Sequence, residues 1–405
     1  MHKHFYLALC GMTILAASQA LAGGYQLQEY SVTSAGRAFA GAGIVGDDYS
    51  AIAFNPAGMV LKQSGVQIGA MGMDIHSHIR GRLSNDAPGD YGKLRNFAVI
   101  PHGFGQYALS EDWRIGLGVY VPFGLGTYYN KSWFGKTHAL SSEIQAIDIN
   151  PSIAWKASKW FSVGGGVIFE RMEARLTNIF ALNGNMSDMN ADGWGHGWNA
   201  GVMVTPTETT RFGIAYRSPV VQRIKGKHHF AGLTEGISST KLVDPEHIQL
   251  TAYQEVGKFG LSAMARWTRW SRFSLLSIDS TALSPLGASP SQVEENWRNT
   301  WTFAGGVDYH RCPHWTFRAG LAYDQGAVKD PVHRTARVPD SNRWISSLGA
   351  SYTMGNWQFD ASYFHMFWGK ARVNSTATTA PGGTRITGTY KTQLNSVGLA
   401  AQYNF

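Results

Sequence analysis

Apolar residues alternate with polar or small residues, position by position, along segments of about ten residues, the length of a transmembrane β-strand. The last segment places one apolar set on a single side: Val397, Leu399, Ala401, Tyr403 and Phe405. Similar segments begin at Trp113, Phe259 and Trp315. Because the side chains of a strand point alternately to its two faces, this period of two predicts strands with one apolar face and one polar or small face.

The composition excludes several other classes of protein. Hydrophobic residues make up 44% of the chain and charged residues only 15%, whereas a disordered chain is poor in apolar residues. A helical membrane protein needs runs of about 20 apolar residues, and none occurs after residue 22. The many glycines and the aromatic ends of the segments therefore favour a large β-structure that faces lipid.

Short polar connections divide the predicted strands into pairs. They lie near residues 110–112, 157–159, 207–209, 256–258, 311–313 and 354–356. Two strands and one longer polar loop separate each connection from the next, as in a barrel with tight turns on one side of the membrane. Six hairpins and one further strand at each end give fourteen strands. The sequence thus predicts an all-β fold, a 14-stranded antiparallel transmembrane β-barrel, with a soluble sandwich or propeller as the alternative.

The first 22 residues have the features of a secretion signal. A basic start at residues 1–4 precedes an apolar stretch, and small residues at positions 20 and 22 suit signal peptidase. We expect a mature start at Gly23 and localisation in the bacterial outer membrane, with Phe405 as the C-terminal signal for the barrel-assembly machinery. Only Cys312 remains after this cleavage, so no intramolecular disulfide is expected.

The formal net charge of +8 comes from scattered cations and not from a dense basic run. This pattern argues against a nucleic-acid partner. In an exported protein it suits a rim that faces lipopolysaccharide or an anionic ligand. We expect outer-membrane lipid and lipopolysaccharide as partners, and a monomer.

Residues 23–62 do not follow the strand pattern. Small residues dominate this stretch, and short helical turns are expected before Pro56. Such a segment cannot bury a core of its own, and a fourteen-stranded barrel has a lumen wide enough to need a plug. We therefore divide the chain into a signal peptide (1–22), an N-terminal hatch inside the lumen (23–62) and the barrel (63–405).

Several short motifs, in order along the chain, resemble the FadL/TodX family of outer-membrane transporters for long-chain fatty acids and other hydrophobic compounds. They are Gly24-Tyr25-Gln26-Leu27, Gly36-Arg37-Ala38 with Gly41, Asp47-Asp48, Asn55-Pro56-Ala57, residues 121–125 and 195–201, Phe317-Arg318-Ala319-Gly320, Tyr323-Asp324-Gln325, Pro339-Asp340, Arg343-Trp344 and Gly349. The resemblance covers essentially the whole mature chain.

The resemblance implies a route for the solute. A hydrophobic compound is captured between the outer loops and passes to a pocket in the lumen; the hatch then shifts, and the solute leaves sideways beside a kinked third strand. The hatch and gate residues would be Gly24, Tyr25, Gln26, Leu27, Asn55, Pro56 and Ala57. The kink would lie at Pro122, Phe123 and Gly124, because proline cannot donate to the ladder and glycine tolerates a bulge.

Residues for substrate binding follow from the outer loops. Phe230 lies in a fourth long loop, at about 222–245, beside several cations, and Ile179 and Phe180 lie in a third loop. An apolar groove edged by cations suits an amphipathic carboxylate. Arg298, near the start of a strand, is the expected luminal partner of a head group. Asn178 stands where fatty-acid transporters of the family carry an arginine, which leaves neutral aromatic solutes open as an alternative substrate.

Other functions are weighed against transport. No nucleophile-elbow pattern supports an outer-membrane lipase, and a plug of this size argues against a general porin. No catalytic residue, metal site or cofactor is expected, and Gly164-Gly165-Gly166 lacks the lysine of a phosphate loop. At the sixth loop we expect a structural ion network of four side chains: Asp324, Arg337, Asp340 and Arg343.

Overall fold

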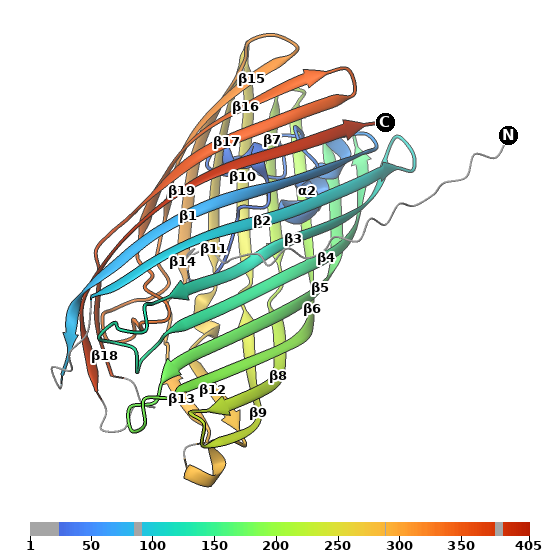
Figure 1. The fold of residues 1–405 in the computed structure, drawn as a ribbon. Helices are drawn as coiled ribbons and strands as arrows, with labels where there is room; N and C mark the ends of the chain where they lie inside the picture. Colours follow the sequence, from blue (N-terminus) through green and yellow to red (C-terminus); the bar gives the residue numbers. More distant parts are fainter. Residues whose placement is uncertain (1–23, 85–90, 288, 377–383) are drawn as a thin grey trace.

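The computed structural model describes residues 24–84, 91–287, 289–376 and 384–405. The expected signal peptide, residues 1–22, lies outside the described residues. Within them, strands cross obliquely around a central lumen and the N-terminal segment is enclosed at one end (Figure 1). No helix in the described ranges is long and apolar enough to cross a membrane.

Fourteen long strands make the wall in the described part of the chain. They are β1 (Gly65–Leu83), β2 (Gly92–Ala108), β3 (Trp113–Tyr128), β4 (Ser141–Ser158), β5 (Phe161–Ile179), β6 (Met186–Thr207), β7 (Thr210–Arg217), β10 (His247–Val256), β11 (Phe259–Thr268), β14 (Thr300–His310), β15 (Trp315–Asp324), β16 (Arg343–Met354), β17 (Trp357–Trp368) and β19 (Arg385–Asn404). Each pairs with its neighbours in antiparallel register, and β1 pairs with both β2 and β19, which closes the barrel. The predicted fold class is therefore confirmed.

Five further strands extend this wall beyond its long-loop end. They are β8 (Val220–Phe230), β9 (Thr234–Asp244), β12 (Leu275–Ser280), β13 (Ser291–Glu294) and β18 (Ala371–Thr376), with the 3-10 helices η2 (Trp270–Arg272) and η3 (Ser284–Leu286) among them. The fourth long loop, expected as irregular chain, is thus largely a hairpin. The reason is visible in β8, where buried and exposed residues continue to alternate, so the ladder persists beyond the expected strand end.

All six tight turns lie where the sequence predicts them. In barrels of this type the short turns face the periplasm and the longer connections face outward. We call the two ends of the barrel the periplasmic and outer ends accordingly. Both the hatch and the C-terminal Asn404 lie toward the periplasmic end, where the Tyr49 hydroxyl donates to the Asn404 side chain at 2.7 Å.

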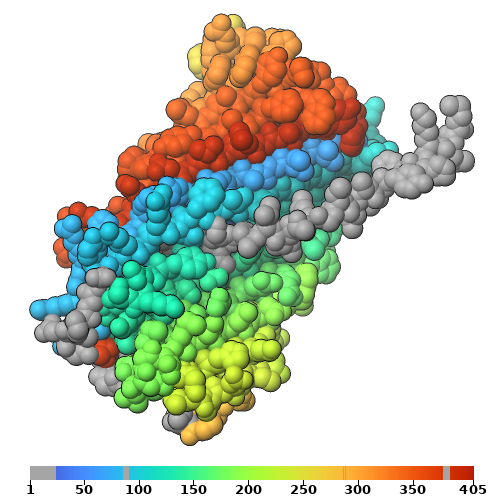
Figure 2. Space-filling model, viewed as in Figure 1, coloured from blue at the N-terminus to red at the C-terminus, as the bar shows by residue number. Residues whose placement is uncertain are grey.

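The two faces of the wall differ in chemistry. The outer face carries exposed apolar side chains such as Ile115, Leu117 and Leu261, while Gln67 and Asn150 are buried on the luminal face. Figure 2 shows the outer face as oblique bands of consecutive strands. Apolar atoms outside and polar atoms inside are what a barrel in lipid requires.

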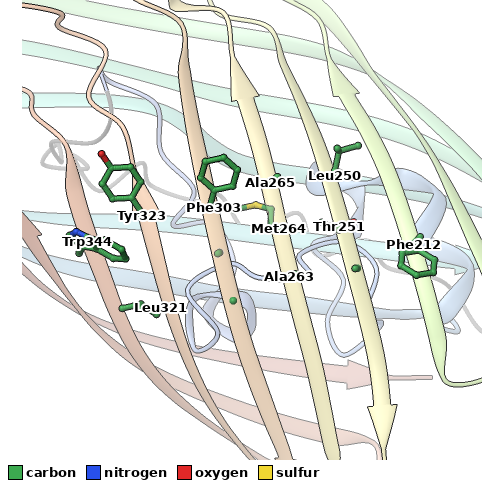
Figure 3. Close-up of a pocket in the computed structure, with 13 residues that line it drawn as sticks. Phe212, Leu250, Thr251, Ala263, Met264, Ala265, Phe303, Leu321, Tyr323 and Trp344 are labelled. Carbon is green, nitrogen blue, oxygen red and sulfur yellow. The ribbon is translucent and has the colours of Figure 1, made fainter.

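A shallow apolar hollow of about 810 Å³ lies on this outer face, across β7, β10, β11 and β14 to β16 (Figure 3). Its floor is formed by small residues, Ala252, Ala263 and Gly305, and Phe212 and Leu321 stand at its sides. Because the floor belongs to the lipid-facing side of the strands, this hollow is part of the membrane surface and does not open to the lumen.

The hatch fills the periplasmic half of the lumen with short helices: α1 (Val32–Ala35), α2 (Ala51–Phe54) and η1 (Pro56–Leu61). Its backbone touches the wall at glycines. A Cβ added at Gly164 would lie 2.5 Å from the Pro56 carbonyl carbon, and one at Gly201 would lie 2.0 Å from the Asn55 amide oxygen. Since real Cβ atoms do not approach so closely, these positions require glycine. The glycine cluster that begins at Gly164 therefore serves close packing.

Polar contacts anchor the hatch as well. Arg37 is fully buried, and its guanidinium contacts Asp47 of the hatch at 2.6 Å and Asp308 of β14 at 3.1 Å. Arg318 of β15 contacts the same Asp47 at 3.0 Å. Burial alone raises the pKa of the Asp47 carboxyl, but these two guanidinium groups outweigh it and hold the pKa well below its usual range.

Candidate functional site

A cavity of about 780 Å³ lies at the outer end of the barrel, a size typical of small-molecule sites. Its walls come from the ends of β5 and β6, from the outer strands β8, β12, β13 and β18, and from several connections between strands, including those that carry His138, Glu295 and Arg337. Apolar side chains form most of the wall: Leu176, Phe180, Leu182, Met189, Phe230, Leu276, Ile278, Leu283 and Val293. Phe180 and Phe230 pack with ring centroids 4.9 Å apart.

One acidic residue, Glu295, and one basic residue, Arg337, line this cavity. The Arg337 guanidinium donates to the Ser141 carbonyl oxygen at 3.0 Å and to the Ser142 hydroxyl at 2.9 Å. One Glu295 carboxyl oxygen accepts the indole N–H of Trp297 at 2.9 Å. No ion pair engages either residue within the described ranges.

Burial changes the charge of these groups. Burial raises the pKa of Glu295 to about 8, although the Trp297 N–H and Arg337 oppose the shift. Burial also lowers the pKa of His138, another cavity residue, to about 4, and Arg337 adds to that shift. At neutral pH the cavity therefore holds a neutral carboxylic acid, a neutral imidazole and the Arg337 cation.

An aromatic cage surrounds Tyr25 at the start of the hatch. The Tyr25 ring lies 5.0 Å from that of Trp270, 6.0 Å from that of Phe273 and 5.9 Å from that of Trp297. On its fourth side is Phe123 of β3, at 5.7 Å. Edge-to-face pairs of this kind contribute about 0.5–1.5 kcal/mol each beyond burial. Glu295, which accepts the Trp297 N–H, thus connects the cavity to the first hatch residues, Tyr25 to Leu27, which we call the gate segment after the role expected from the sequence.

The ladder between β2 and β3 is incomplete. Pairing ends at Gly103 with Val119. Among the barrel strands, the next part of β3 pairs with β4 and not with β2, and a bulge lies between Tyr120 and Phe123. Pro122 lies within this bulge.

The hatch pairs with β3 where β2 does not. The Leu27 N–H donates to the Pro122 carbonyl oxygen at 2.7 Å, and the Gly124 N–H donates to the Tyr25 carbonyl oxygen at 2.8 Å. An isolated bridge joins Gln26 to Phe123. The gate segment therefore takes the place of a neighbouring strand at the irregular part of β3.

Of the residues predicted to bind substrate, Asn178, Phe180 and Phe230 line the cavity. Ile179 lies beside it, packed against a second apolar cluster of the outer end. Arg298 does not line the cavity: it is exposed, and its guanidinium donates to the Gly326 carbonyl oxygen and the Asn342 side chain. The described cation that lines the cavity is Arg337.

The expected ion network is smaller than predicted. Arg343 pairs with Asp324 and, at 3.5 Å, with Asp340. The Asp340 carboxylate also accepts the N–H groups of Gly24, at 3.2 Å, and of Ala327. Arg337 forms no ion pair with these acids and lines the cavity instead, from the connection between β15 and β16.

The sequence reading missed Glu295 and the three cage residues Trp270, Phe273 and Trp297. The local sequence contained no clear signal, because in residues 269–299 the three aromatic residues are accompanied by six charged ones. Aromatic rings near the outer end could belong to the membrane interface or to the lumen. Only the tertiary structure shows that the connection between β11 and β14 folds inward and places these rings in the lumen.

Comparison with known proteins agrees with this architecture. The family model described as outer membrane protein transport protein (OMPP1/FadL/TodX) matches residues 13–405. The chain is 30% identical to the 47 kDa outer membrane protein of Pasteurella multocida, over 98% of this chain and 97% of that one. It is 24% identical to the long-chain fatty acid transport protein of Salmonella typhi, over 85% of this chain and 87% of the relative.

Solved structures share the fold. A FadL homologue of Pseudomonas aeruginosa superimposes with a TM-score of 0.86 at 24% identity, over 94% of this chain and all of that one. The toluene transporter TbuX of Ralstonia pickettii gives 0.67 at 18% identity, over 94% and 99% of the two chains. With a matching family model over almost its whole length, this chain belongs to the OMPP1/FadL/TodX family of outer-membrane transport proteins.

Proposed function

We propose that this protein takes up long-chain fatty acids across the outer membrane. The solute enters the cavity at the outer end, moves past the Tyr25 cage as the hatch N-terminus shifts, and leaves sideways beside the bulge of β3. The observation that carries the proposal is the cavity itself, which combines long apolar walls with the Arg337 cation. The proposed route contains no catalytic step, which agrees with relatives that are described as transport proteins.

The apolar walls supply the driving force for capture. Moving apolar surface out of water is favourable by about 25 cal/mol per Å². An extended acyl chain against Leu176, Phe180 and Phe230 gains this term. A water-filled pore would not offer it, because the chain would stay hydrated throughout its passage.

The gate supplies the exit. At the β3 bulge, the backbone of the hatch and not β2 completes the hydrogen bonds of Pro122 and Gly124. Withdrawal of the residues from Tyr25 to Leu27 leaves that part of β3 without a partner on one side. A lateral opening then needs no further break in the wall, which favours sideways release over release through the hatch.

The test compares oleate with oleyl alcohol, which has the same length and no charge. A charge-assisted hydrogen bond contributes about 1.5–3 kcal/mol, so Arg337→Met should weaken oleate binding about tenfold to a hundredfold and leave the alcohol unchanged. Arg298→Met is the matched control, because that cation lies outside the cavity. Unchanged oleate binding in Arg337→Met, or an equal loss in Arg298→Met, would reject the proposal.

Neutral aromatic hydrocarbons are a second candidate substrate. Asn178, an uncharged side chain, lines the cavity, and two aromatic rings meet in its wall. Toluene binding that equals or exceeds oleate binding in the wild type would favour this alternative.

We also propose contact with lipopolysaccharide at the outer rim and recognition of Phe405 by the barrel-assembly machinery. Phe405 is 68% exposed at the periplasmic end, so a partner can reach it. Phe405→Ala should lower the amount of folded protein in the outer membrane without changing ligand affinity per folded molecule.

A further inference from the structure

Glu295 is an unusual side chain for an apolar capture site. It is 4% exposed, it lines the cavity, and it lies in the part of the chain that returns from β13 toward β14. One of its oxygens is fixed by the Trp297 N–H at 2.9 Å, and its own backbone N–H donates to the Ser274 carbonyl oxygen at 2.9 Å. The carboxyl group is therefore held in place and cannot turn away to solvent.

Arg337 faces the same cavity from the opposite connection. Its guanidinium is fixed by the Ser141 carbonyl oxygen and the Ser142 hydroxyl. The two groups influence each other electrostatically, yet no ion pair joins them in the described part of the chain. An arginine held this way can accept an anionic head group, provided that no nearby negative charge already compensates it.

We propose that Glu295 determines the specificity of the cavity: as a neutral carboxylic acid it leaves Arg337 available to an anionic head group, and as a carboxylate it compensates Arg337 and restricts the cavity to uncharged solutes. The inference rests on the proposed function, since it concerns the same cavity. It names a residue that determines specificity and relates the charge of that residue to the charge of the solute, neither of which follows from family membership.

Among the described residues that line the cavity, Glu295 is the one whose charge changes near neutral pH. Burial raises its pKa to about 8. Burial lowers the pKa of the Arg337 guanidinium to about 10, so it remains mostly a cation at pH 9. His138 is neutral, with a pKa lowered to about 4, and His228 is held between the hydroxyls of Ser187 and Ser280.

Tyr25, from the hatch, also interacts electrostatically with Glu295. Burial raises the pKa of its phenol well above the usual value, so it stays neutral as well. Below about pH 8 the cavity therefore carries one net positive charge, and above that pH its net charge is zero.

The experiment measures binding of decanesulfonate, a permanent anion, and 1-decanol, a neutral solute, by the full protein in a non-ionic detergent at pH 6.5 and pH 9. Probes without a titratable head group keep the ligand's own protonation out of the result. We expect the wild type to bind the sulfonate roughly tenfold more weakly at pH 9 than at pH 6.5, and the alcohol equally at both.

Glu295→Gln removes the titration and keeps an oxygen for the Trp297 N–H. Its sulfonate affinity should be the same at both pH values and equal to that of the wild type at pH 6.5. Glu294→Gln is the matched control, because Glu294 is the exposed neighbour and does not line the cavity; it should behave as the wild type does.

The outcomes separate this inference from the proposed function. If both probes bind, and the ratio of their affinities depends on neither pH nor Glu295, the inference is overturned. The proposed capture cavity is not affected by that result. Binding of neither probe overturns both. The wild-type affinity for the sulfonate at the two pH values tests the inference by itself. The inference can therefore be rejected even if the Glu295→Gln variant folds poorly.

Discussion

Arg37 illustrates how one side chain can hold the hatch in the lumen. Its guanidinium is buried between Asp47 of the hatch and Asp308 of the wall. Removing one partner of a buried ion pair costs about 3–5 kcal/mol, because the remaining charge stays buried without compensation. In Arg37→Met we therefore expect the hatch to loosen, measured as faster cleavage of residues 24–62 by a protease in detergent.

The control for this change is Arg82→Met, which removes an exposed cation at the outer end of β1. The barrel itself should still migrate as a folded species on unheated gels. Equal protease resistance of the wild type and Arg37→Met would show that Arg318 alone anchors Asp47.

At the scale of elements, the bulge of β3 sets the width of the proposed exit. A Cβ added at Gly124 would lie 2.9 Å from a Leu27 methyl carbon, so a valine there occupies the space between β3 and the gate segment. In Pro122→Val with Gly124→Val we expect uptake of labelled oleate to fall roughly tenfold while binding in the cavity is unchanged.

Gly103→Val on β2 is the matched control, because its added Cβ would meet nothing closer than 3.8 Å. Unchanged uptake in the double variant would contradict a lateral exit at β3. A parallel loss of binding would show instead that the change disturbs the outer cavity.

The aromatic cage gives a second prediction at this scale. Trp297→Ala removes one ring that packs on Tyr25, and an aromatic pair contributes about 0.5–1.5 kcal/mol. Opening of the gate should then become up to about tenfold more frequent. Hydrogen exchange of the Leu27 amide, which is bonded to the Pro122 carbonyl oxygen, measures this directly. Trp301→Ala, at an exposed ring on the outer face, should leave the exchange rate unchanged.

For the whole molecule, the proposed route requires that the hatch closes the lumen to a steady flow of ions. The described lumen is filled at its periplasmic half by α1, α2 and η1. In planar bilayers the full protein should show little steady conductance, and a variant that lacks residues 24–62 should show large conductance. Heat-modifiable migration and a β-type circular dichroism spectrum of both proteins confirm that the barrel has formed. A large steady conductance of the full protein would contradict the gated route.

The wall of the barrel could be predicted because its determinants are local. Alternation with a period of two, six polar turns and aromatic strand ends each depend on residues close together in the chain, and a strand in lipid must show them wherever it lies. The hatch could be predicted from its composition, since a segment of small residues cannot bury a core of its own. The motif with Asn55, Pro56 and Ala57 added the resemblance to the family.

The site depended on contacts between residues far apart in the chain. Arg298 and Arg337 both lie in connections between strands, and nothing in the local sequence distinguishes the exposed one from the one that lines the cavity. Glu295 gains its character from burial behind Trp297, and Tyr25 gains its cage from a connection more than two hundred residues away. The sequence by itself determined the fourteen strands of the wall and the family, because hydrophobic alternation and short motifs are local properties. Only the tertiary structure decided which charges face the cavity, because that depends on how the long connections fold over the mouth of the barrel.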